Sequence, residues 1–126
     1  MNQTDFYLLG EVMKNIAVII RNSPFNTIKN SEGLRMSVGL TLKDDKVTVV
    51  FMDNGVWSAT KLNPEVINAP DTEKQFSALK MLNCKIIADA QSLEERNISK
   101  TLDFITIKNR EEISKLIAES DIVIPF

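Results

Sequence analysis

Five short apolar segments, rich in valine and isoleucine, are spaced along the chain. Most of them are continuous rather than alternating with polar residues, which is typical of parallel strands that helices cover on both faces. The segments are Ile16–Arg21, Val47–Met52, Lys85–Ala88, Phe104–Ile107 and Ile122–Ile124. The pattern therefore predicts a five-stranded, mainly parallel sheet.

The intervals between these segments show helical periodicity, with apolar residues recurring at spacings of three and four. The predicted helices cover residues 27–42, 72–82, 90–96 and 110–119. The last of them has the pattern of a capping box, in which Asn109 caps the helix and Glu112 reaches back to it. Strands that alternate with helices predict a three-layer α/β fold with helices on both faces of the sheet.

The domain organisation predicted from the sequence is simple. Residues 15–126 form a single α/β domain, because the chain has no internal repeat, no low-complexity tract and no long linker. Residues 1–14 are predicted to be an N-terminal extension, in which Leu9, Val12 and Met13 give a short helical pattern.

Composition removes several classes of chemistry. The 126 residues include 15 basic and 17 acidic side chains, one cysteine and no histidine. Without histidine the chain cannot form a Ser-His-Asp relay or a histidine-based metal site, and one cysteine cannot form an internal disulfide or a Cys-rich cluster. The net charge of −2 gives no bulk attraction to phosphate backbones, so direct nucleic-acid binding is not expected.

The expected compartment follows from two features of the sequence. The longest strictly apolar run, Ile16–Ile20, is far too short to span a bilayer, and the N-terminal residues lack the pattern of a signal peptide. An unpaired thiol also suits a reducing compartment. We therefore expect a cytoplasmic protein that does not contact a membrane.

The loops that follow the first three predicted strands form the candidate binding cleft, because ligands of parallel α/β folds bind beyond the carboxyl ends of the strands. Its predicted lining consists of Arg21, Asn22, Ser23, Phe25, Asn26, Asp53, Asn54, Trp57 and Asp89. The first loop lacks the glycine pattern of a nucleotide-binding loop. An ordinary strand-to-helix turn is therefore favoured there over an anion site.

Two residues of this cleft have alternative interpretations. Trp57 either lines a pocket or subunit contact, or covers the edge of the core, and the sequence does not favour one over the other. Asp89 closes the third predicted strand, where a functional carboxylate would lie. It can also cap the short helix that follows, through the backbone N–H of Gln91 or Ser92, and this interpretation is favoured.

Cys84 is the candidate nucleophile because it is the only thiol. It opens the third predicted strand, at the end opposite the expected cleft. Lys85 is adjacent in sequence, but neighbours in a strand point to opposite faces. A reactive cysteine needs exposure and an electropositive setting, so a buried structural thiol is the favoured interpretation.

Several segments resemble the DsrE/DsrF/TusC family. They are Ser23–Thr27, Glu32–Leu34, Val49–Trp57, Ile113–Ile117 and Ser120–Phe126. The first three resemble the family's Ser-containing turn, its Glu-Gly/Ala-Leu helix segment and its Phe-Phe-x-x-Asp-Gly-Val segment. The last two resemble the final helix and strand of the DsrF/TusC branch.

This resemblance, which covers about residues 15–126, implies a flavodoxin-like fold and assembly into trimers or hexamers of like or related subunits. It also implies a role in intracellular sulfur transfer, either for 2-thiolation of a tRNA uridine or in dissimilatory sulfur oxidation. In such relays a cysteine thiolate accepts sulfane sulfur and passes it to another sulfur-transfer protein, with no metal or organic cofactor.

The position of the family's sulfur-carrying cysteine is occupied by a different residue. In active subunits that cysteine follows the third strand, several residues before an Arg-Gly-Ile/Val segment. The equivalent segment is Arg96–Ile98, and counting back places Asp89 at the carrier position. Related DsrF/TusC-type subunits also lack the carrier cysteine. The resemblance therefore predicts a non-catalytic subunit of a sulfur relay. The alternatives are a sulfur acceptor that uses Cys84 and a small-ligand-binding module that has lost the relay.

Overall fold

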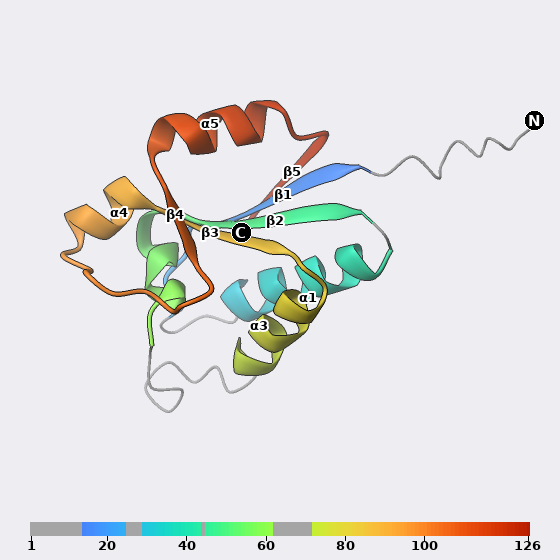
Figure 1. Ribbon diagram of the computed structural model, residues 1–126, viewed down its shortest axis with the longest axis horizontal. Helices are drawn as coiled ribbons and strands as arrows, with labels where there is room; N and C mark the ends of the chain where they lie inside the picture. Colours follow the sequence, from blue (N-terminus) through green and yellow to red (C-terminus); the bar gives the residue numbers. More distant parts are fainter. Residues whose placement is uncertain (1–13, 25–28, 44, 62–71) are drawn as a thin grey trace, which may run out of the picture.

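The computed structural model describes residues 14–24, 29–43, 45–61 and 72–126. Within them, five parallel strands form one sheet in the order β4-β3-β2-β1-β5 (Figure 1). The strands are β1 (Asn15–Ile20), β2 (Lys46–Phe51), β3 (Lys85–Asp89), β4 (Thr106–Lys108) and β5 (Ile122–Pro125). The predicted five-stranded parallel sheet is therefore confirmed. The predicted N-terminal helix, with Leu9, Val12 and Met13, lies outside the described residues.

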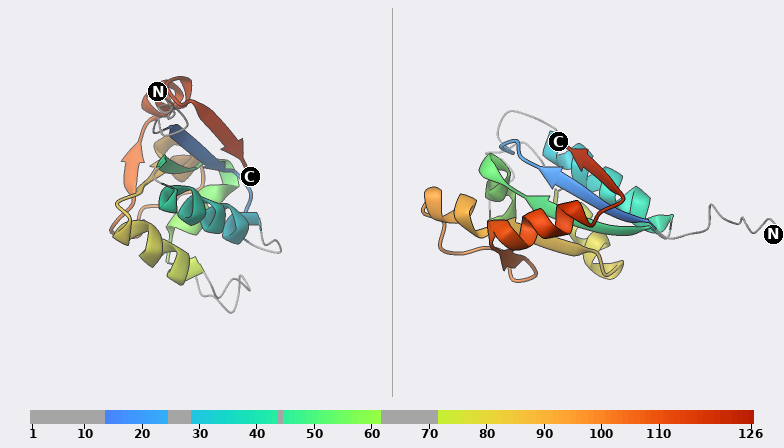
Figure 2. Two further views of the ribbon diagram at one scale, coloured as in Figure 1. Left: turned by 90° about the vertical axis from the view of Figure 1, so that its right-hand side faces the viewer. Right: turned by 90° about the horizontal axis from the view of Figure 1, so that it is seen from above.

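Helices cover both faces of this sheet, as predicted, and give three layers (Figures 1 and 2). Two helices, α1 (Lys29–Leu42) and α3 (Thr72–Met81), lie together on one face. The helix α5 (Arg110–Ala118) lies on the other face. The strands β4 and β5 lie at opposite edges of the sheet, since β4 pairs with β3 and β5 pairs with β1. The chain between them, which contains α5, crosses this second face (Figure 2).

Alternate side chains of the strands fill two cores of unequal size. In the core beneath α1 and α3, Val18, Val49 and Ile86 of the sheet pack together with residues of both helices. The smaller core beneath α5 contains Ala17, Ile19, Val50, Ile87 and Ile113. Burial on both faces explains why the strands are continuous apolar segments rather than alternating ones.

Two predicted elements differ from the structure. The fourth strand was expected at Phe104–Ile107, but β4 begins at Thr106. Phe104 and Ile105 lie in the turn before β4 and pack on the core, which accounts for their apolar side chains. The centre of the Phe104 ring lies 5.2 Å from that of the Phe76 ring. The segment after β2, expected to be a loop, forms a 3-10 helix, η2 (Asp53–Ala59).

The remaining helix, α4 (Ala90–Glu95), lies beside η2 at the carboxyl edge of the sheet. Its contacts with η2 bring two loops together that are about forty residues apart in sequence. None of the described helices is long and apolar enough to cross a membrane.

Candidate functional site

The ends of β1, β2 and β3 bring candidate residues together at the carboxyl edge of the sheet. Phe51 of β2 pairs with Ile20 of β1 and with Ala88 of β3, so the three strands end level with one another. Arg21, Asp53 and Asp89 follow or close these strands and lie at this edge. These three residues are therefore neighbours at one edge, as expected for parallel strands that end level with one another.

Asp89 is completely buried at the end of β3 and has several hydrogen-bond donors. Its Oδ2 accepts bonds from the backbone N–H of Ser92 at 3.2 Å, from the Ser92 hydroxyl, and from Nε of Arg110 at 2.7 Å. The Ser92 N–H bond is the N-cap of α4, which confirms the favoured interpretation of Asp89. Its other oxygen, Oδ1, is buried and has no partner among the described residues.

Arg110 is the partner of Asp89 that the sequence analysis did not identify. It is the first residue of α5, and the predicted capping box between Asn109 and Glu112 fixes the start of that helix. The hydrogen bond to the Asp89 carboxylate raises the pKa of the Arg110 guanidinium, which stays charged. The only feature of the sequence that could have pointed to Arg110 was its place just after the carboxyl end of β4, where ligand-binding residues are expected.

Asp53 links the ends of β1 and β4. Its Oδ2 lies 2.8 Å from Nε of Arg21, and its Oδ1 lies 3.7 Å from a terminal nitrogen of Arg110. Its backbone N–H donates to the hydroxyl of Ser92 at 2.9 Å. Asp53 has a φ of 51°, a left-handed conformation that aspartate tolerates better than most residues. The two carboxylates and two guanidiniums thus form one connected network.

The second loop is packed closely against the first. A Cβ on Gly55 would lie 2.0 Å from the carbonyl oxygen of Ile20, so only glycine fits at this position of η2. The side-chain oxygen of Asn54 accepts a bond from Nε of Arg96 at 3.0 Å. Trp57 is half-buried in η2. This arrangement ties the end of β2 to both β1 and α4.

The first loop is described only in part. Asn22 and Ser23 are half-buried after β1. Phe25 and Asn26 lie outside the described residues. Of the predicted set, Arg21, Asp53, Asn54 and Asp89 are therefore brought together, with Arg96 and Arg110 as additional members.

Cys84 lies at the opposite end of β3 and has a structural position. It follows α3 in a Schellman motif, in which the N–H of Cys84 bonds to the carbonyl of Leu79 and the N–H of Asn83 bonds to that of Lys80. Asn83 has the left-handed φ of 58° that this motif requires. The thiol donates to the carbonyl of Val47 at 3.1 Å and packs against the larger core.

The surroundings of Cys84 do not activate the thiol. Burial raises the pKa of Cys84 from 9.0 to about 11, because a thiolate loses its hydration there. At neutral pH the group is therefore a protonated thiol, which is a weak nucleophile. Among the described residues, no group of three or more acidic or cysteine side chains is arranged to hold a metal ion.

Comparison with known proteins identifies the family. The family model described as "DsrE/DsrF-like family" matches residues 14–126. The chain is 26% identical over 119 residues to the protein TusC of Buchnera aphidicola subsp. Baizongia pistaciae (strain Bp), covering 90% of this chain and all of that protein. The crystal structure of the ychN protein from E. coli has a TM-score of 0.76 and 16% identity, covering 90% of this chain and all of that one, and shows the same fold. This chain belongs to the DsrE/DsrF-like family.

Proposed function

We propose that this protein is a non-catalytic subunit of an intracellular sulfur-transfer assembly. Membership of the DsrE/DsrF-like family and the similarity to TusC support a place in such an assembly. The single observation that carries the non-catalytic part is the arrangement at the two ends of β3. Asp89 occupies the carboxyl end, where the sequence resemblance predicts a carrier cysteine, and Cys84 lies at the amino end.

Asp89 cannot take over the role of a sulfur carrier. A persulfide forms on a thiolate, and a carboxylate has no sulfur that could accept one. The Asp89 side chain is also fully buried and engaged by Ser92 and Arg110. Its role in this proposal is structural, since it caps α4 and holds the start of α5 against the end of β3.

Cys84 is poorly suited to replace the missing carrier. Its raised pKa leaves very little thiolate at neutral pH, and it lies at the edge of the sheet away from Asp89. In this proposal the subunit contributes surface to an assembly with copies of itself, as a trimer or hexamer, or with related subunits. A persulfide passes through a partner rather than through this chain.

The test is sulfur loading followed by mass spectrometry. The native protein is incubated at neutral pH with a polysulfide donor, beside the Cys84→Ser variant and beside native protein unfolded in urea. We expect loading of the unfolded chain, which shows that the donor is competent, and no stable loading of the folded chain. Stable addition of sulfur to folded native protein, absent from Cys84→Ser, would show that Cys84 is a carrier.

Assembly is tested separately from loading. Sedimentation of the purified chain, alone and mixed with a DsrE-type subunit that carries a cysteine, measures whether a complex forms. We expect a discrete oligomer or a mixed complex. A chain that stays monomeric in both samples would contradict its role as a subunit.

A further inference from the structure

Three arginines at the carboxyl edge share one mode of attachment. Each donates its Nε–H to a side-chain oxygen: Arg21 to Asp53 at 2.8 Å, Arg96 to Asn54 at 3.0 Å and Arg110 to Asp89 at 2.7 Å. Attachment through Nε fixes the plane of a guanidinium and leaves its terminal nitrogens at the far end of the group. The sequence places these residues on three different loops, after β1, after α4 and at the start of α5.

Shared partners bring the three guanidiniums to one place. Arg21 and Arg110 lie on the two oxygens of the Asp53 carboxylate, at 2.8 and 3.7 Å. Arg96 donates from a terminal nitrogen to the carbonyl of Ser92 at 3.2 Å, and Arg110 donates to the Ser92 hydroxyl at 3.4 Å. Arg110 is therefore the central member, adjacent to Arg21 through Asp53 and to Arg96 through Ser92.

All three side chains keep exposed surface, although one terminal nitrogen of Arg96 and one of Arg110 donate to Ser92. The side chains of Arg21, Arg110 and Arg96 are 64%, 40% and 21% exposed. Among the described residues, none accepts a hydrogen bond from either terminal nitrogen of Arg21. Donors that are held in position and still face solvent can bind a ligand without first losing their conformational freedom.

Three guanidiniums, of Arg21, Arg96 and Arg110, lie at this edge with three carboxylates, of Asp53, Asp89 and Glu95. The net charge of the chain is −2. Of the two carboxylates that hold Arg21 and Arg110, Asp89 is completely buried and only Asp53 reaches the surface. Glu95 approaches a terminal nitrogen of Arg96 no closer than 3.7 Å. At the surface, three guanidiniums therefore meet two exposed carboxylates, Asp53 and Glu95, while the third carboxylate, Asp89, is buried.

We propose that the edge formed by Arg21, Arg110 and Arg96 binds a tetrahedral oxyanion of the phosphate or sulfate type. The guanidinium fork matches such anions in two parallel hydrogen bonds, and two forks held by one carboxylate can bind neighbouring oxygens. Arg21 and Arg110 make the primary contacts, and Arg96 borders the site. The proposal does not depend on sulfur transfer by this chain, because it concerns only binding of the anion.

The experiment measures anion binding at the arginines themselves. Native protein labelled with ¹⁵N is titrated with sodium phosphate and, separately, with sodium sulfate, at constant ionic strength set with sodium chloride. The arginine Nε–H resonances are followed by NMR. We expect saturable shifts at Arg21 and Arg110 with at least one of the two anions. Tighter binding of phosphate indicates a phosphate ester as the ligand, and tighter binding of sulfate indicates a sulfur oxyanion.

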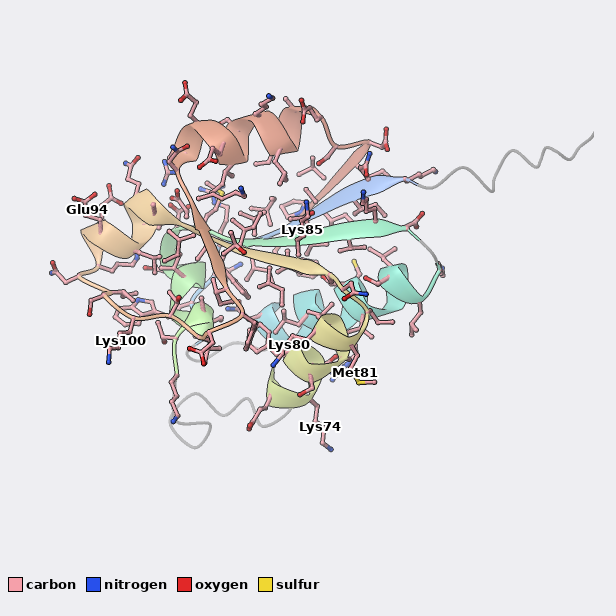
Figure 3. The ribbon with its side chains drawn as sticks, in the orientation of Figure 1. Lys74, Lys80, Met81, Lys85, Glu94 and Lys100 are labelled. Carbon is pink, nitrogen blue, oxygen red and sulfur yellow. The ribbon has the colours of Figure 1, made fainter. Side chains whose placement is uncertain are left out.

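Variants separate this site from diffuse attraction. Arg21→Gln should weaken binding about tenfold, as expected for the loss of charge-assisted hydrogen bonds. Arg21→Lys, which keeps the charge but loses the fork, should recover only part of that loss. Lys85→Gln is the matched control, because Lys85 is an exposed cation at the other end of β3 (Figure 3). It should bind as the native protein does.

Three results would overturn the proposal. The first is the absence of saturable shifts with either anion. The second is unchanged binding in Arg21→Gln, and the third is an equal weakening in Lys85→Gln. Because Arg21 is largely exposed, Arg21→Gln should keep the native unfolding midpoint in urea, so that a loss of binding reports the contact and not the fold. Sulfur loading at Cys84 has no bearing on these outcomes.

Discussion

The two ends of β3 hold two different ionisable groups in different surroundings. At the carboxyl end, Asp89 is buried with a guanidinium and hydrogen-bond donors around it. At the amino end, Cys84 is largely buried against the core, and burial raises the pKa of its thiol. At Cys84 the loss of hydration on burial outweighs the hydrogen bonds that would favour the thiolate, so the neutral thiol is preferred. The position of a cysteine along the strand therefore bears directly on its reactivity.

The role of Cys84 becomes clearer beside Ile98, which occupies the same position at the end of α4. The N–H of Ile98 bonds to the carbonyl of Leu93, as that of Cys84 bonds to the carbonyl of Leu79. In both cases an asparagine with a left-handed φ precedes the residue, Asn97 at 54° and Asn83 at 58°. Both side chains pack on the larger core. Cys84 thus serves as a small apolar residue in a helix-ending motif.

The largest expected effect is at the carboxyl edge, where the loops are packed most closely. Gly55→Ala would place a Cβ 2.0 Å from the carbonyl oxygen of Ile20, and backbone must move to relieve this contact. We expect the free energy of unfolding to fall by about 3 kcal/mol. Equilibrium unfolding in urea measures it.

Gly39→Ala is the matched control for that substitution. A Cβ at Gly39, in the interior of α1, has no neighbour within 4 Å, so the change should raise the free energy of unfolding by about 0.5–1 kcal/mol. If both variants changed stability by the same amount and sign, the close approach of η2 to β1 would be contradicted.

The second prediction concerns the reactivity of the thiol at the amino end. With a pKa of about 11 rather than 9.0, Cys84 should be alkylated at pH 8 about 100-fold more slowly than a free thiol. The rate should continue to rise up to about pH 11. A rate that levels off near pH 9, or that matches the urea-unfolded chain, would show that burial does not suppress ionisation.

The same pKa difference gives a dependence of stability on pH. The folded chain holds its thiol proton up to about pH 11, whereas the unfolded chain releases it near pH 9.0. The contribution of this group to stability is therefore complete below pH 9 and is lost as the pH rises toward 11. Cys84→Ala should remove this part of the alkaline loss.

The smallest of the three effects is expected for Asp89→Ala. The substitution removes the cap of α4 and the partner of Arg110, but Arg110 is 40% exposed and can turn to water. We expect a loss of about 2 kcal/mol in the free energy of unfolding, measured in urea. Glu94→Gln, an exposed change on the same helix, should have almost no effect. A loss of stability no larger than that of the Glu94→Gln control would contradict the structural role proposed for Asp89.

Local chemistry made part of the structure predictable. Continuous apolar segments identified four of the five strands to within one residue at each end, because strands buried on both faces need apolar residues throughout. Phe104–Ile107 was the exception, since packing from a turn and pairing in a strand both require apolar residues. The caps at Asp89 and Asn109 were predictable because each side chain bonds to backbone three residues later.

The partners of the site residues were not predictable in the same way. Arg110 lies 21 residues after Asp89, and Asn54 lies 42 residues before Arg96. No periodicity relates residues so far apart, and the order of the strands in the sheet decides which loops meet. The 3-10 helix after β2 was missed for a related reason, because its shape depends on how closely Gly55 approaches β1.

The sequence by itself therefore determined the elements, the family resemblance and the absence of a cysteine at the end of β3. These depend on residue identity and on interactions over a few residues, which a single chain carries in its order. Only the tertiary structure decided that Asp89 is held by Arg110, that the partly buried Cys84 has a raised pKa, and that three arginines meet at one edge. Burial and long-range pairing exist only once the sheet brings distant loops together.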